Sequence, residues 1–290
     1  MKHLAPHVFD DVVALDLLEG SRANIRFLMK NGLKDALAKL YCEYHGIVAK
    51  PDDAKSKIKH LPLTSAVLIA AYEDPPTAIE GLKSFVQEKL SPNVCPMCGS
   101  LKTGTADHYL PKSAFPEYSF YSWNLVPACD CNSMRGDTLV GVDPDEYVMH
   151  PFFQPLMSQR IISAVFAFAP GSDDPNISIG KLYPAGLPAA AVDFHISSIH
   201  ARTTMLSWMT AEWGRLLDVP LSFLTWVPRK AVITMLDLQE RLGDVLYFAD
   251  DKLATPNNWT SALLHGVLNS PEAMERLLRA IDHYRASAGT

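Results

Sequence analysis

The chain has 290 residues, of which 48% are hydrophobic and 20% are charged, so it is globular, not disordered or collagen-like. Its formal net charge of −6 excludes a general basic surface for nucleic acid and leaves such binding to a local groove or a partner. Its apolar runs are far shorter than the ~20 residues of a membrane span, and Asp10, Asp11 and Asp16 interrupt the first of them. We therefore expect a cytoplasmic protein with no membrane partner.

The first ninety residues have the pattern of a helical region. Leucine and isoleucine recur at helical spacing over residues 9–45, with lysine and arginine between them. Residues 48–62 are rich in lysine and aspartate and predict a solvated connector. Helices are expected over 63–73 and, after the breaker Pro75-Pro76, over 77–90. Residues 1–90 are thus predicted to form a helical N-terminal region.

Residues 153–290 are predicted to hold strands followed by helices. β-branched and aromatic residues favour strands at 160–169, 176–181 and 191–197. Helical periodicity returns over 199–218, 228–249 and 257–285, with a new segment starting at Pro271. Neither terminal region carries a recognisable catalytic motif.

Four of the five cysteines lie between positions 95 and 131. Cys95 and Cys98, followed by Gly99, have the spacing of a zinc knuckle, and Cys129 with Cys131 supplies a second pair. Four thiolates predict a structural zinc site, because no coordination position stays open for water. One residue separates the second pair, so this reasoning leaves open that another ligand, such as His150, replaces one cysteine.

Asp107 and His108 lie between the two cysteine pairs. A carboxylate can hold a divalent cation, and a neighbouring imidazole can take a proton from water near neutral pH. Asn132 offers a neutral oxygen ligand of the kind that Mg²⁺ accepts. These residue types favour metal-assisted hydrolysis.

In order along the chain, Cys-x-x-Cys, Asp-His-x-x-Pro-Lys, Asn-Leu-Val-Pro-x-Cys and Cys-Asn-x-x-Arg-Gly-Asp resemble a zinc-stapled HNH endonuclease. The resemblance covers residues 95–137. It implies an α+β chain in which a ββα-metal module, residues 91–152, is embedded between the two mostly helical regions, 1–90 and 153–290. The chain departs from the family at the second cysteine pair, where one residue is missing, so Asn124 and Asn132 are eight positions apart instead of nine.

The resemblance also implies a role for each motif residue. His108 would be the general base, Asp107 and Asn132 would ligate the catalytic Mg²⁺ or Mn²⁺, and Asn124 would orient His108. Cys95, Cys98, Cys129 and Cys131 would hold the structural Zn²⁺. Lys112 and Arg135 would contact nucleic acid, with Arg135 standing where the family usually has lysine.

These roles predict an endonuclease that hydrolyses phosphodiester bonds, with DNA as the expected substrate. The family resemblance extends to effector nucleases of bacterial anti-phage defence systems, which implies a separate ATPase chain as partner. Residues 95–137 hold three cationic side chains against four carboxylates, so flanking helices or a partner must supply further positive charge. The alternative is a zinc-stapled nucleic-acid-binding or assembly module without catalysis, and a third reading is a toxin restrained by a partner.

Overall fold

The computed structural model describes residues 1–48, 65–90, 92–172, 174–220, 224 and 232–288. Helices predominate, and the strands form two separate two-stranded antiparallel sheets, so the chain is of mixed α and β class, as expected. It divides into two compact units. Unit 1 is essentially residues 3–156 with 187–202, and unit 2 is essentially residues 157–186 with 203–290. Within the described part of the chain, no helix is both long and apolar enough to cross a membrane.

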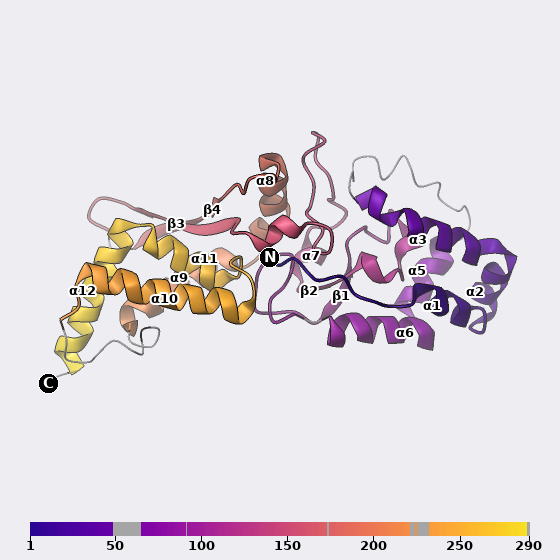
Figure 1. The fold of residues 1–290 in the computed structure, drawn as a ribbon, viewed down its shortest axis with the longest axis horizontal. Coiled ribbons are helices and arrows are strands. Elements are labelled where there is room, and N and C mark those ends of the chain that lie inside the picture. Colours follow the sequence, from indigo (N-terminus) through magenta and orange to yellow (C-terminus); the bar gives the residue numbers. More distant parts are fainter. Residues whose placement is uncertain (49–64, 91, 173, 221–223, 225–231, 289–290) are drawn as a thin grey trace. The chain divides into compact units, whose positions relative to one another are not determined.

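In the N-terminal part of unit 1, the described residues form five α-helices (Figure 1). Their bounds are α1 Asp11–Leu18, α2 Ala23–Leu28, α3 Lys34–Val48, α5 Ser65–Glu73 and α6 Thr77–Ser84. A π-helical turn, Phe85–Lys89, extends α6. The expected continuous helical stretch over 9–45 is broken twice, first at Gly20-Ser21 and then at Gly32, whose φ of 95° only glycine adopts readily. The predicted connector lies outside the described residues, apart from its first residue, which ends α3.

The cysteine-rich part of unit 1 contains a small hairpin followed by a short helix. Strands β1, Thr105–His108, and β2, Leu125–Ala128, pair antiparallel, with His108 opposite Leu125. Helix α7, Cys131–Met134, follows directly and packs against β1. Single 3-10 turns lie at Pro116–Tyr118 and Ser122–Asn124, in the loop that joins the strands. In this order of strand, strand and helix, Asp107 and His108 lie on β1, and Cys131 and Asn132 begin the helix that packs against it.

Helix α8, Ala189–Ser198, corrects one expectation. Residues 191–197 were predicted as a strand, because valine, phenylalanine and isoleucine alternate with polar residues there. The helix begins after Pro188, whose fixed φ suits a helix start, and the alanines at 189–191 favour its first turn. A 3-10 turn, His200–Arg202, completes this part of unit 1.

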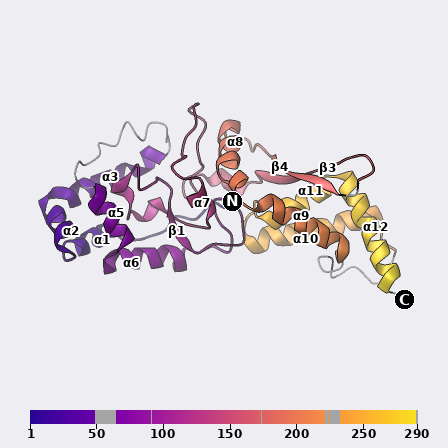
Figure 2. The same ribbon diagram turned by 180° about the vertical axis from the view of Figure 1, so that it is seen from behind.

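Unit 2 is built on the hairpin of β3, Ile162–Phe168, and β4, Pro175–Lys181, which confirms the two strands predicted there. The 3-10 turn Pro155–Ser158 leads from unit 1 into it, and its described residues also form four helices. These are α9 Met205–Asp218, α10 Met235–Leu253, α11 Trp259–Leu268 and α12 Pro271–Ala288, so the predicted break at Pro271 is confirmed. Helix α11 lies along β3 and contacts the other three helices, and Figure 2 shows the reverse side.

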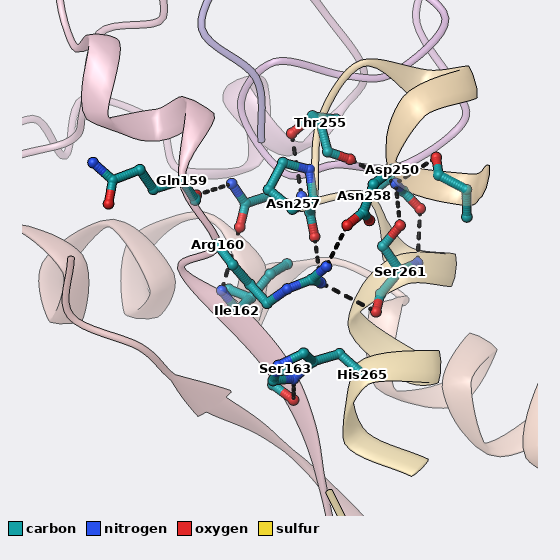
Figure 3. Close-up of polar contacts among 12 residues, drawn as sticks. Gln159, Arg160, Ile162, Ser163, Asp250, Thr255, Asn257, Asn258, Ser261 and His265 are labelled. Carbon is teal, nitrogen blue, oxygen red and sulfur yellow. Dashed lines mark hydrogen bonds and ion pairs between the residues drawn. The ribbon is translucent and has the colours of Figure 1, made fainter. Parts of the chain in front are cut away.

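A buried polar network fixes the start of β3 against α10 and α11 (Figure 3). The guanidinium of Arg160 donates to the Asp250 carboxylate at 2.6 Å and to the Pro256 carbonyl at 2.8 Å. Asn257 is fully buried, and its side-chain oxygen accepts from the Ile161 backbone N–H at 2.6 Å. At Gly266, a Cβ would lie 2.3 Å from the Ala164 carbonyl oxygen, so only glycine lets α11 approach β3 so closely. These contacts have the character of a structural core.

Candidate metal centre and hydrolytic site

The four clustered cysteines come together at one buried point. The Sγ atoms of Cys95 and Cys131 are 3.6 Å apart, and those of Cys98 and Cys129 are 3.5 Å apart. All four sulfur atoms lie within 4.8 Å of one another. Sulfurs bound tetrahedrally at ~2.3 Å from a zinc ion would be about 3.8 Å apart. The donor set and its geometry therefore fit a metal ion such as zinc.

Local backbone geometry explains how the short second pair still reaches the cluster. Cys129 follows the last residue of β2 and Cys131 opens α7, so the chain turns sharply between them. The backbone N–H groups of Cys129 and Cys131 point at the Cys95 and Cys129 sulfurs, at 3.4 and 3.5 Å. Hydrogen bonds from the neighbouring thiols lower the pKa of Cys129, which favours the thiolate that a metal requires.

The alternative ligand considered from the sequence, His150, lies elsewhere. Its Nε2 is 3.2 Å from the Tyr44 hydroxyl, and its Nδ1 accepts from the Phe152 backbone N–H at 3.2 Å. Burial keeps its pKa well below the ordinary value, so it is a neutral core histidine. Cys42, the fifth cysteine, is exposed and takes no part in the cluster.

His108 ends β1 and is only 6% exposed. Its Nε2 lies 2.8 Å from the carbonyl oxygen of Ser119. A carbonyl can only accept a hydrogen bond, so Nε2 carries the proton and Nδ1 holds the lone pair of the neutral ring. Among the described residues, Nδ1 has no hydrogen-bond partner. Burial lowers the pKa of His108 to about 4, so the imidazole is a neutral base at pH 7.

Asp107, the residue before His108, is half-buried and points its carboxylate toward α7. One oxygen accepts from the His108 backbone N–H at 2.8 Å, and the other accepts from the Ser133 hydroxyl at 2.7 Å. Carboxylate oxygens have several acceptor positions, so both contacts leave capacity for a cation. Asp107 therefore fits the ligand role expected for it.

Asn124 is fully buried and holds the loop between the strands. Its Oδ1 accepts from the Leu110 backbone N–H at 2.7 Å, and its Nδ2 donates to the carbonyls of Leu110 and Tyr118 at 3.1 and 3.0 Å. Tyr118 immediately precedes Ser119, whose carbonyl binds His108. Asn124 thus acts on His108 through the backbone that orients the imidazole.

Asn132 and Arg135 form a buried pair instead of a surface site, and each is 2% exposed. The Asn132 amide donates to the His108 carbonyl at 2.8 Å, and its Oδ1 accepts from Arg135 Nε at 2.8 Å. With its oxygen engaged in this way, Asn132 does not fit as a second cation ligand. The expected cation site is therefore represented by Asp107 alone.

Arg135 directs its remaining donors inward. They reach the backbone carbonyls of Thr138 at 2.6 Å, of His108 at 3.0 Å and of Tyr109. We expected Arg135 to contact a phosphate, and this geometry corrects that expectation. A guanidinium that donates to buried carbonyls is not presented to a ligand. Lys112, the other residue predicted to contact nucleic acid, is at the surface and pairs with Glu73 at 2.9 Å.

Two tyrosines near the site carried no distinguishing signal in the sequence. The Tyr44 hydroxyl, from α3, donates to Asn124 Oδ1 at 2.8 Å. The Tyr72 ring, from α5, packs edge-on against the His108 ring with centroids 4.4 Å apart, and its hydroxyl donates to the Ala106 carbonyl at 2.8 Å. Both are buried residues of a helix, where tyrosine is ordinary. Only the tertiary structure brings them to the motif.

Comparison with known proteins adds one partial likeness. A stretch of 60 residues is 40% identical to Protein ea31 of Escherichia phage lambda, and the match covers 20% of this chain and 20% of that protein. The chain therefore spans about one fifth of the relative's length. No family model matches the chain, and no solved structure matches it.

Proposed function

We propose that this chain is a metal-dependent endonuclease of the HNH type that hydrolyses phosphodiester bonds, with DNA as its substrate. The observation that carries the proposal is the placement of His108. A neutral imidazole with a fixed tautomer ends a strand, follows a carboxylate, and lies on a hairpin whose far end meets the four-cysteine cluster. That is the arrangement a ββα-metal module requires for its general base.

In this mechanism the Nδ1 lone pair of His108 takes a proton from a water molecule, whose oxygen attacks the scissile phosphorus. The bond from phosphorus to the 3′ oxygen breaks, and this leaving oxygen takes a proton from solvent. Ser119 keeps the opposite nitrogen protonated, and so keeps the lone pair on the reactive side. Asp107 would hold the divalent cation, which supplies charge stabilisation to the phosphoryl oxygens when bound. The metal held by the four cysteines would be zinc with a structural role, because all four of its positions are filled by thiolates.

The sequence resemblance further supports an effector role in anti-phage defence together with a separate ATPase chain.

The alternative of a binding or assembly module without catalysis is favoured by one observation. The side-chain oxygen of Asn132, which would be the second cation ligand, is buried and accepts a hydrogen bond from Arg135. The two candidates differ in whether His108 matters for chemistry.

Plasmid cleavage tests the proposal. Purified protein is incubated with supercoiled plasmid and Mg²⁺ or Mn²⁺, beside His108→Ala and a matched control, His283→Ala, whose imidazole is exposed on α12. We expect cleavage by the wild type and His283→Ala, no cleavage by His108→Ala, and equal zinc content in all three. Equal cleavage by His108→Ala would reject the assignment of the base, and a wild type that binds zinc and DNA without cutting would favour the binding module.

A further inference from the structure

Two lysines from different parts of unit 1 lie near the ring of Tyr72. That ring also packs against His108. The Nζ of Lys83, from α6, lies 4.1 Å from the ring centroid, and the Nζ of Lys112 lies 5.2 Å from it. The same ring is 4.4 Å from the His108 imidazole. Two cationic groups are therefore held beside the proposed general base.

Neither lysine is neutralised by a buried acid. Lys83 donates to the Tyr72 carbonyl at 2.7 Å, which is a neutral partner. Lys112 pairs with Glu73, whose side chain is 60% exposed, and exposed pairs of this kind are readily exchanged. Burial and the neighbouring charge of Lys112 lower the pKa of Lys83, although Glu80 and Glu73 act in the opposite direction. An anion at this place would relieve the repulsion between the two ammonium groups.

We propose that Lys83 and Lys112 form a phosphate clamp that holds the phosphodiester backbone of a nucleic acid against the His108 side of the module, with Tyr72 as the positioning residue between them. The inference rests on the proposed function and deepens it, because it assigns substrate binding to a helix outside the motif. Lys83 supplies positive charge where residues 95–137 have three cations and four carboxylates. The N-terminal helical region thereby completes the site.

The test measures DNA binding without cleavage. All variants are made on His108→Ala, and binding of a fluorescein-labelled DNA duplex is followed by fluorescence polarisation over a salt titration. Lys83→Gln and Lys112→Gln are each expected to weaken binding about tenfold and to reduce the log–log salt slope by roughly 0.9. Glu73→Gln, which removes the competing carboxylate, is expected to tighten binding. The matched control is Lys102→Gln, an exposed lysine of the same unit, which should bind like the parent.

Glutamine keeps a donor for the Tyr72 carbonyl, and thermal unfolding verifies that Lys83→Gln remains folded. The proposal is overturned if folded Lys83→Gln binds DNA with the parent's affinity and salt slope, or if the parent shows no salt-dependent binding. Failure of the proposed function would give a different result. Cleavage would then not depend on His108, although the lysine variants would still bind DNA more weakly. In the cleaving enzyme, Lys83→Gln should raise KM with a smaller effect on kcat, as expected for ground-state binding.

Discussion

The carbonyl oxygen of Ser119 accepts a hydrogen bond from Nε2 of His108 at 2.8 Å, and this one contact decides which nitrogen of the imidazole can act as a base. The contact depends on the loop conformation that Asn124 maintains from the other side. A residue eleven positions along the chain therefore sets the tautomer of the proposed catalytic histidine.

Activity should persist to unusually low pH. An imidazole with the ordinary pKa of ~6.5 loses its lone pair below that pH, whereas burial lowers the pKa of His108 to about 4. The neutral base is therefore retained as pH falls from 8 to 5, and kcat/KM should show no acid limb near 6.5. Cleavage rates measured over this range at constant ionic strength check the expectation. In Tyr72→Ala, which opens the ring to water, the acid limb should move upward, and a wild-type limb near 6.5 would contradict the assignment.

Removal of any cluster cysteine should cost both metal and stability. Cys98→Ser leaves three thiols within a buried site, and the remaining thiolates lose the ion that compensates their charge. We expect about one zinc per wild-type chain by elemental analysis, much less in Cys98→Ser, and a lower unfolding temperature. Cys42→Ser, at an exposed cysteine outside the cluster, is the control and should match the wild type in both measurements. Full zinc content in Cys98→Ser would argue against four-cysteine coordination.

Substitution of Arg135 should affect folding more than DNA contact. Arg135→Ala removes the guanidinium donors to the Tyr109 and Thr138 carbonyls and one of the two side-chain donors to the His108 carbonyl, and the expected loss is about 3 kcal/mol or more of unfolding free energy. Urea unfolding measures the loss, with Lys102→Ala as the control at an exposed cation. A phosphate-binding role would give the reverse pattern, with little change in stability and a reduced salt slope for DNA binding.

His195 should make the protein acid-sensitive. Its Nδ1 accepts from the Met149 backbone N–H at 3.0 Å, and its Nε2 donates to the Met97 carbonyl at 2.8 Å, so the ring is neutral when folded. Burial lowers its pKa to about 3, whereas the unfolded state protonates near 6.5. The unfolded state therefore binds more protons between these values, and stability is lost as pH falls from 6.5 toward 3.

The comparison that checks this is urea unfolding at pH 7 and pH 5, for wild type and His195→Gln. The wild type should lose about 2 kcal/mol more than the variant over this interval. His283→Gln, at an exposed histidine, controls for the general effect of removing an imidazole. An equal loss in wild type and His195→Gln would show that His195 is not the group responsible.

The sequence predicted the parts of the structure that depend on local pattern. Helical periodicity located most helices of unit 2, Pro271 located the start of α12, and cysteine spacing located the cluster, because these signals act over a few residues. The strand predicted at 191–197 was wrong because the buried residues have helical spacing: Val192 and Ile196 lie four positions apart on the buried face, whereas Phe194 between them is only half-buried. The short spacing of Cys129 and Cys131 left the second ligand pair open, and only the turn from β2 into α7 resolves it.

The local sequence pattern could not predict the environment of the motif residues. Arg135 was expected to contact nucleic acid because of its position in the motif, but it is buried and donates to three backbone carbonyls that tertiary packing brings near it. Tyr44, Tyr72 and Lys83 lie 24 or more positions before Asp107, on helices whose patterns do not single them out. Their proximity to the motif follows from how those helices pack, which no spacing in the sequence specifies.

The chain leaves unit 1 after residue 156 and returns to it at residues 187–202, after building the β3–β4 hairpin of unit 2. Helix α8 carries His195, which contacts the backbone between the first two cluster cysteines. During synthesis, unit 1 therefore remains incomplete until residue 202 has left the ribosome, although its hairpin and all four cysteines emerge much earlier. A nascent chain that stops before α8 exposes the Met97 carbonyl, so the proposed hydrolytic motif depends on a segment that is translated some fifty residues after it.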